Sequence, residues 1–226
     1  MKFYIKSTLT GIFCFTTLYA CADNFSDGMA LYEQENYPAA AAAFKKAADK
    51  GKADAQFNLG LMYLNAEGVA QDYKQAMSLF EQAAVQGNVR AQVNLARMYA
   101  KGKGVEPNYD KAVPWFKKAA DAGYADAQYS LGVLYVTGNG APRDYRKAFD
   151  LLLQAAEQYN ASAQYQLGLM YFKGKGVPVN LVEAMKWFIL AGDYDDAVSY
   201  RRYSASTMSK AQVAEAKALA DEWIAS

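Results

Sequence analysis

The chain has 226 residues, with 24 lysines and arginines against 23 aspartates and glutamates and a formal net charge of +1. Nucleic-acid-binding domains are usually basic, and proteins that bind membranes by charge carry polybasic patches, so this balance argues against both classes. Histidine, the commonest general base and metal ligand, is absent, and the two cysteines, Cys14 and Cys21, precede residue 23. We therefore expect no metal, no cofactor and no disulfide framework.

Residues 1–22 have the features of a secretory signal peptide. Two lysines precede an apolar stretch at residues 7–19, and residues 20–22, Ala-Cys-Ala, fit the small-x-small cleavage rule. A transmembrane helix needs about 20 apolar residues, so we predict export. Residues 18–21 also resemble a lipobox, in which Cys21 becomes the lipidated first residue. A soluble periplasmic product and an outer-membrane lipoprotein both remain open.

Residues 23–52 are predicted to form a short N-terminal unit that caps the rest of the chain. Small and aromatic residues recur there at helical spacings, which indicates helices with one buried face. These residues are Gly28, Leu31, Tyr37, Ala40, Phe44 and Ala47.

The chain then repeats itself with a period of 36 residues and without insertion or deletion. The four blocks are residues 53–88, 89–124, 125–160 and 161–196. Each block carries the same leucine, glutamine, tyrosine and loop glycine, at Leu59, Gln56, Tyr63 and Gly68 in the first block. A fixed period of this length indicates stacked supersecondary units, which form extended concave surfaces. We therefore interpret the recurring residues as core and the chain as a binding scaffold.

Each block is predicted to be an antiparallel pair of helices. In the third block, Leu131, Leu134 and Tyr135 share one helical face, and glycines at 138 and 140 end that helix. A second helix is expected from Tyr145 to about residue 158. A glycine recurs inside the first helix, at Gly60, Gly132 and Gly168, which indicates that another helix passes close by. Tyr159 replaces the turn glycine of the third block, so we expect Asn160 to take the left-handed conformation there.

Residues 197–226 are predicted to form an incomplete unit and a capping helix. A helix over residues 194–208 is followed by one that starts after Ser209, a favourable N-cap residue. Its apolar stripe, which ends at Trp223, is expected to seal the last block.

The blocks resemble the Sel-one-like repeat (SLR) family, a relative of the tetratricopeptide repeats. The resemblance rests on Ala-x-Ala-Gln-x-x-Leu-Gly-x-x-Tyr, then Gly-x-Gly-Val, Tyr-x-x-Ala and Phe-x-x-Ala-Ala, and it covers about residues 53–223. It implies an all-α, right-handed α-solenoid of stacked helix pairs, with the first helix of each pair on the concave face. It also implies adaptor roles in protein–protein interaction. One cysteine-rich branch of the family acts on β-lactams, and this chain lacks those cysteines.

By analogy with tetratricopeptides, the groove is lined by first-helix positions that vary between blocks. The candidate partner-binding residues are Phe57, Leu61, Asn94, Arg97, Tyr129, Val133, Tyr165, Leu169 and Phe172. They form an apolar and aromatic trough that suits a peptide helix or an extended segment. The alternative is that curvature lets adjacent helices bury the row of Phe57, Val93, Tyr129 and Tyr165.

The leading functional prediction is an exported interaction scaffold of the bacterial cell envelope, without enzymatic activity, that binds a protein or peptide partner in the concave groove. The first alternative is a peptidoglycan- or glycan-binding module that uses the groove aromatics for stacking. The remote alternative is a β-lactamase-like or cell-wall enzyme, for which no catalytic residues are predicted. No nucleic acid is expected as a partner, and membrane attachment is expected only through lipidation of Cys21.

Overall fold

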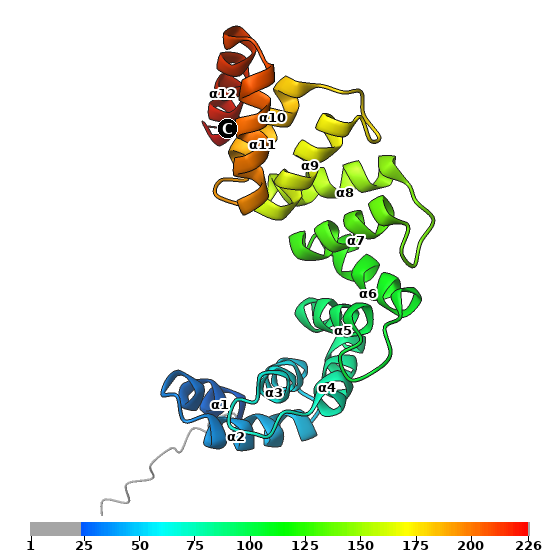
Figure 1. Ribbon diagram of the computed structural model, residues 1–226. Coiled ribbons are helices and arrows are strands. Elements are labelled where there is room, and N and C mark those ends of the chain that lie inside the picture. Colours follow the sequence, from blue (N-terminus) through cyan, green and yellow to red (C-terminus); the bar gives the residue numbers. More distant parts are fainter. Residues whose placement is uncertain (1–23, 226) are drawn as a thin grey trace, which may run out of the picture.

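The computed structural model describes residues 24–225, apart from the side chain of Asp195. Cys14, Cys21 and the predicted signal peptide lie outside the described residues. In the described part, twelve helices and no strand follow one another along an arc (Figure 1). The predicted all-α solenoid of consecutively packed helix pairs is confirmed. No helix within residues 24–225 combines the length and the apolar character needed to span a membrane.

The helices alternate between the first and second members of each pair. The N-terminal unit consists of α1 (Asn24–Glu33) and α2 (Tyr37–Asp49). The blocks supply α3 (Ala53–Asn65) with α4 (Tyr73–Val85), α5 (Val89–Lys101) with α6 (Tyr109–Asp121), α7 (Ala125–Thr137) with α8 (Tyr145–Glu157), and α9 (Ala161–Lys173) with α10 (Leu181–Leu190). The chain ends with α11 (Asp195–Thr207) and α12 (Lys210–Ala225).

The helix boundaries follow from local side-chain chemistry. In the four repeats, each second helix begins after a residue whose side chain accepts hydrogen bonds from the first-turn N–H groups. These N-cap residues are Asp72, Asn108, Asp144 and Asn180. The first helices end at a left-handed residue, which is glycine in three blocks and Ala66 in the first.

The prediction that Asn160 adopts the left-handed conformation is wrong. Tyr159 itself has a φ of 60°, and Asn160 has a φ of −71°. The reason is that the Asn160 side chain caps α9, accepting a hydrogen bond from the Ala163 N–H at 2.9 Å. The capping role requires an extended backbone at Asn160, so the preceding residue makes the turn.

The recurring mid-helix glycines mark the closest approach within each pair, as predicted. A Cβ atom on Gly60 would lie 2.7 Å from Cε1 of Phe80, and one on Gly168 would lie 2.5 Å from Cε1 of Phe188. Since both rings are fully buried, these glycines allow a phenylalanine of the second helix to pack against the backbone of the first.

Buried glutamines tie each repeat to the unit before it. Gln56, Gln92, Gln128 and Gln164 are at most 7% exposed. Each Nε2 donates to a backbone carbonyl eight residues earlier, near the end of the preceding second helix. These carbonyls lie in the last turn of their helices, where the helical hydrogen-bond pattern ends. Each also accepts from the backbone N–H three residues later in the turn, and the glutamine adds a second hydrogen bond that crosses the junction.

The C-terminal helix covers the last repeat, as predicted. The rings of Trp223 on α12 and Trp187 on α10 lie 4.9 Å apart in an edge-to-face arrangement. Ser209 begins α12 with a reciprocal pair of hydrogen bonds to Gln212, at 3.3 Å and 3.0 Å, which is a capping box in form.

Candidate functional site

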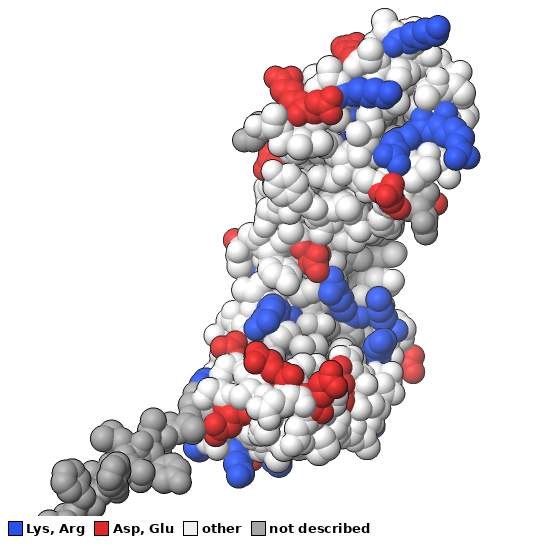
Figure 2. Space-filling view, turned by 90° about the vertical axis from the view of Figure 1, so that its left-hand side faces the viewer, with Lys and Arg blue, Asp and Glu red and all other residues white. Residues whose placement is uncertain are grey.

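The concave side of the arc carries the predicted groove. Figure 2 looks onto the side toward which the arc of Figure 1 opens, and it shows a largely uncharged surface with small, separate groups of basic and acidic side chains. Three clefts open between successive first helices, α1 and α3, α5 and α7, and α9 and α11. They divide the predicted groove into separate sites.

Phe57 and Tyr165 do not line the groove and are corrected to core residues, at 3% and 7% exposure. The Phe57 ring packs against Phe80 at a centroid distance of 5.9 Å, and the guanidinium of Arg90 covers it at 4.6 Å. Tyr165 stacks on Tyr194 at 5.0 Å. The next unit along the array covers these two residues, as in the alternative left open by the sequence, and Val93 of the same row is also buried, whereas Tyr129 is only partly buried.

The cleft between α5 and α7 collects three of the predicted residues, Arg97, Tyr129 and Val133. It has a volume of about 480 Å³, within the range of roughly 300–1,000 Å³ that is usual for ligand pockets. Ala100, Leu134 and Phe116 extend its apolar lining, and Lys101, Ser130, Thr137 and Asn139 supply its polar lining. The site therefore combines apolar and aromatic surface with two basic side chains.

Asp126 fixes the orientation of Arg97 at this cleft. Its Oδ2 lies 3.0 Å from Nη2 of Arg97, and its Oδ1 accepts a hydrogen bond from Nδ2 of Asn160 at 3.1 Å. Both partners of the ion pair are more than two-fifths exposed, so the pair contributes little to stability. Burial raises the pKa of the Tyr129 phenol above its ordinary value of 10.0, so the phenol, which is neutral at neutral pH in any case, stays a hydrogen-bond donor at higher pH than a free tyrosine.

The cleft between α9 and α11 is aromatic. Phe172, Tyr200 and Tyr203 line it together with Ser199, and its volume is about 320 Å³. The Phe172 ring lies 5.4 Å from Tyr200 and 5.7 Å from Tyr203, edge to face in both cases. Sequence reasoning identified Phe172 and missed both tyrosines because the compared positions came from the four repeat blocks, and α11 lies almost wholly beyond the last of them. The sequence does place Tyr200 and Tyr203 three residues apart on the helix predicted over residues 194–208, and this spacing could have indicated a shared aromatic face.

The other predicted residues have smaller roles on this side. Leu61 lines a cleft of about 130 Å³ between α1 and α3, with Met29, Tyr32, Phe44 and Asn58. The Asn94 amide donates to the carbonyl of Arg90 at 3.0 Å, so its nitrogen points along its own helix. Leu169 packs against the buried cluster of α9, α10 and α11. The structure therefore does not bring all nine predicted residues into one site.

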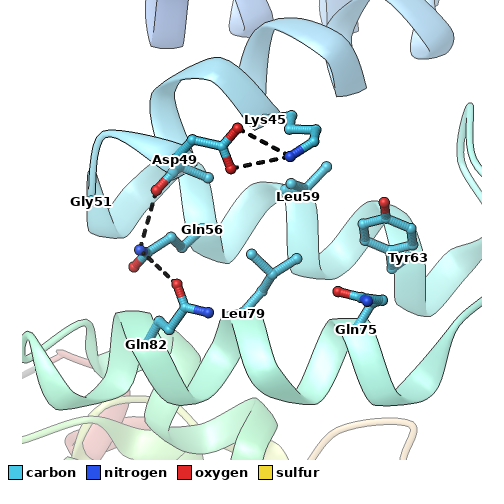
Figure 3. A pocket seen from close by; sticks show the side chains of 10 residues that line it. Lys45, Asp49, Gly51, Gln56, Leu59, Tyr63, Gln75, Leu79 and Gln82 are labelled. Atoms are coloured by element: carbon cyan, nitrogen blue, oxygen red, sulfur yellow. Dashed lines mark hydrogen bonds and ion pairs between the residues drawn. The ribbon is translucent and has the colours of Figure 1, made fainter.

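A further cleft lies at the junction between the N-terminal unit and the first repeat, and the sequence did not predict it. Its volume is about 420 Å³. Figure 3 shows Lys45 and Asp49 on one side and Gln75, Leu79 and Gln82 on the opposite side. Its buried glutamine, Gln56, is already bonded to Gln82 at 3.1 Å.

The sequence profile of the Sel1 repeat matches residues 53–88, 89–124, 125–160 and 161–193. This chain belongs to the Sel1 repeat family. A tetratricopeptide repeat profile matches residues 27–70, which include the N-terminal unit. A comparison with curated proteins found no match.

Solved structures of other Sel1 repeat proteins share this fold. The protective antigen c5321 of uropathogenic Escherichia coli, which displays an SLR fold, is 34% identical, with a TM-score of 0.82 over 89% of this chain. A Sel1 repeat protein from Oxalobacter formigenes is 27% identical, with a TM-score of 0.70 over 82% of this chain and 86% of that one. The chain spans less than half of the E. coli protein, 44% of its length.

Sel1 repeat proteins are generally scaffolds for protein–protein interaction and typically lack enzymatic activity. The match to the Sel1 repeat profile confirms the predicted membership of this family. In the described residues, histidine, cysteine, aspartate and glutamate side chains form no group that could hold a metal ion.

Proposed function

We propose that this protein is an exported interaction scaffold of the bacterial cell envelope that binds a peptide segment of a partner protein in the cleft between α5 and α7. The observation that carries the proposal is the convergence of Arg97, Tyr129 and Val133 on one cleft of about 480 Å³. Export is supported by the lysines, apolar stretch and cleavage-like triplet of residues 1–22.

The chemistry of the cleft suits one bulky apolar side chain of a partner together with a neighbouring carboxylate. Tyr129 and Val133 offer apolar surface, while Arg97 and Lys101 offer positive charge. Aromatic residues and arginine are the commonest hot spots of interfaces. Since Asp126 already orients the guanidinium of Arg97, little side-chain freedom is lost when a partner binds.

In-cell photo-crosslinking tests this proposal. A photoreactive amino acid at position 133 should capture one envelope protein, and the same group at position 85, an exposed valine at the end of α4, should not. Val133→Arg should abolish the capture when the probe is moved to position 137 on the same cleft, while helical circular dichroism stays unchanged. Equal capture from positions 133 and 85, or capture that survives Val133→Arg, would refute the assignment.

The α9–α11 cleft favours glycan binding as a second candidate. Sugar rings commonly stack on exposed aromatic faces, and Tyr203 is 56% exposed beside Phe172. The test is cosedimentation with purified peptidoglycan sacculi. Pelleting of the wild type that Tyr203→Ala reduces, and that Val133→Arg does not, would establish this function in place of the first.

A further inference from the structure

At the N-terminal end of the described chain, a cleft opens between α1 and α2. Its volume is about 520 Å³. Six of the residues that line it are Asn24, Asp27, Leu31, Ala39, Ala43 and Lys46. None of them belongs to the concave clefts described above.

These six residues occupy the same repeat positions as six residues of the junction cleft in Figure 3. The register is fixed by Gly28, which approaches Phe44 as Gly60 approaches Phe80. The equivalent pairs are Asn24 and Gln56, Asp27 and Leu59, Leu31 and Tyr63, Ala39 and Gln75, Ala43 and Leu79, and Lys46 and Gln82. The end cleft is therefore the face on which a preceding helix pair would stack.

In the first repeat, the preceding unit covers this face. Lys45, Ala48 and Asp49 of α2 close the junction cleft, and Leu59 and Leu79 are buried in one cluster with residues of α2. At the N-terminal end, the equivalent Asp27 and Ala43 are only half-buried, and the neighbouring Ala30 and Ala42 are exposed. Terminal repeats of a solenoid usually present a polar outer face, and the middle of this face is alanine and leucine.

The end face carries both an acidic and a basic side chain, so its charges can match those of the same face on a second copy. Asp27 lies on α1 and Lys46 lies on α2, and neither forms an ion pair within the described residues. If a two-fold axis ran along the cleft, α1 of one copy would lie over α2 of the other. Each Asp27 would then face the Lys46 of the second copy, and this pairing would occur twice, because a two-fold interface uses the same patch on both subunits. The alanines allow the helices to approach closely.

We propose that two copies of this protein stack end to end through the α1–α2 face, with reciprocal pairing of Asp27 and Lys46. The dimer continues the solenoid in both directions from its centre. Its two concave surfaces then belong to one particle, which binds two copies of a partner, or one partner with two sites, with increased avidity.

Sedimentation velocity over a range of concentrations tests the proposal on protein purified from cells that produce the full chain. The wild type should form a dimer. Lys46→Asp and Asp27→Lys should each raise its dissociation constant by roughly 10- to 100-fold, because each single reversal places two like-charged contacts in the interface. The double variant Asp27→Lys/Lys46→Asp should restore the wild-type constant. Lys117→Asp, an equal charge change on the exposed surface of α6, serves as the control and should have no effect.

Each other outcome overturns the proposal. A monomer at every concentration would show that this face does not join two copies. A dimer that tolerates both single reversals would use a different surface. Failure of the double variant to recover, with unchanged thermal unfolding, would exclude the reciprocal pairing.

Discussion

The second repeat lacks one hydrogen bond that the first and third repeats have, and a single substitution should restore it. Gln92 donates from Nε2 to the carbonyl of Ala84 at 3.1 Å, but its buried Oε1 has no donor among the described residues. In the first repeat, the equivalent Gln56 accepts from Nε2 of Gln86 at 2.7 Å. Residue 122 stands where Gln86 would be, and it is alanine. We therefore predict that Ala122→Gln stabilises the protein.

The backbone at position 122 is already suited to the change. Ala122 has φ −80° and ψ 5°, close to the −77° and 1° of Gln86. Supplying a donor to a buried, unpaired oxygen should recover about 1–3 kcal/mol, and ordering a glutamine side chain should cost about 1 kcal/mol. The net gain in the free energy of unfolding is about 1 kcal/mol, or about 2–4 °C in Tm for a chain of this length.

Urea unfolding followed by circular dichroism measures this gain. Ala122→Met is the matched control, since it adds a side chain of similar length without a donor, and it should give no gain. Gln86→Ala should remove the same interaction from the first repeat and cost at least about 1 kcal/mol. Equal effects of Ala122→Gln and Ala122→Met, or a neutral Gln86→Ala, would show that the hydrogen bond is not the source of the stability.

Three further predictions concern other parts of the chain. Gly168→Ala should destabilise the protein by about 1–3 kcal/mol in urea unfolding, because the new Cβ would lie 2.5 Å from Cε1 of Phe188; a neutral result would refute the close packing. Burial raises the pKa of Tyr165 from 10.0 to about 12, so its contribution to stability should be complete below pH 10 and lost as the pH rises towards 12. The pKa of Tyr32 is also raised to about 12, so a tyrosinate absorbance titration should lose one of its two latest-ionising groups in Tyr165→Phe, and an unchanged curve would contradict this. Mass spectrometry of the exported protein should find Asp23 as its first residue, also in Cys21→Ser; a lipid on Cys21 would instead establish the lipoprotein.

The fold could be predicted from the sequence because its determinants recur. A residue that appears in four equivalent places, such as the leucine of Leu59 or the glycine of Gly168, reports a packing requirement rather than chance. The error at Asn160 has a different cause. Glycine and asparagine both favour left-handed turns, but asparagine is also a strong N-cap, and the periodicity alone did not show which role the third block uses.

The binding face could be predicted only in part. The sequence placed Arg97, Tyr129 and Val133 on the concave side, and the structure joins them in one cleft. It could not show that Phe57 and Tyr165 are covered, because their burial depends on the side chain that the next helix brings over them. Burial of this kind comes from the superhelical geometry, which no single repeat contains.

If this chain is the scaffold proposed above, the positions that differ between its repeats are the ones that can select a partner. The side chains that recur in every block pack in the core or form the glutamine hydrogen bonds across the junctions. Only side chains at positions that vary between blocks are therefore available to contact a partner. At one such position the chain carries Leu61, Arg97, Val133 and Leu169 in successive blocks, and only the second places a charge in a cleft. The same reasoning applies to the N-terminal unit, where Asp27 replaces the leucine of the first repeat. A charge at this position is also what a polar end cap requires, so the feature that favours a specific neighbour over indiscriminate stacking is the presence of Lys46 on the same face, where it can pair with Asp27 of a second copy in the stacking proposed above.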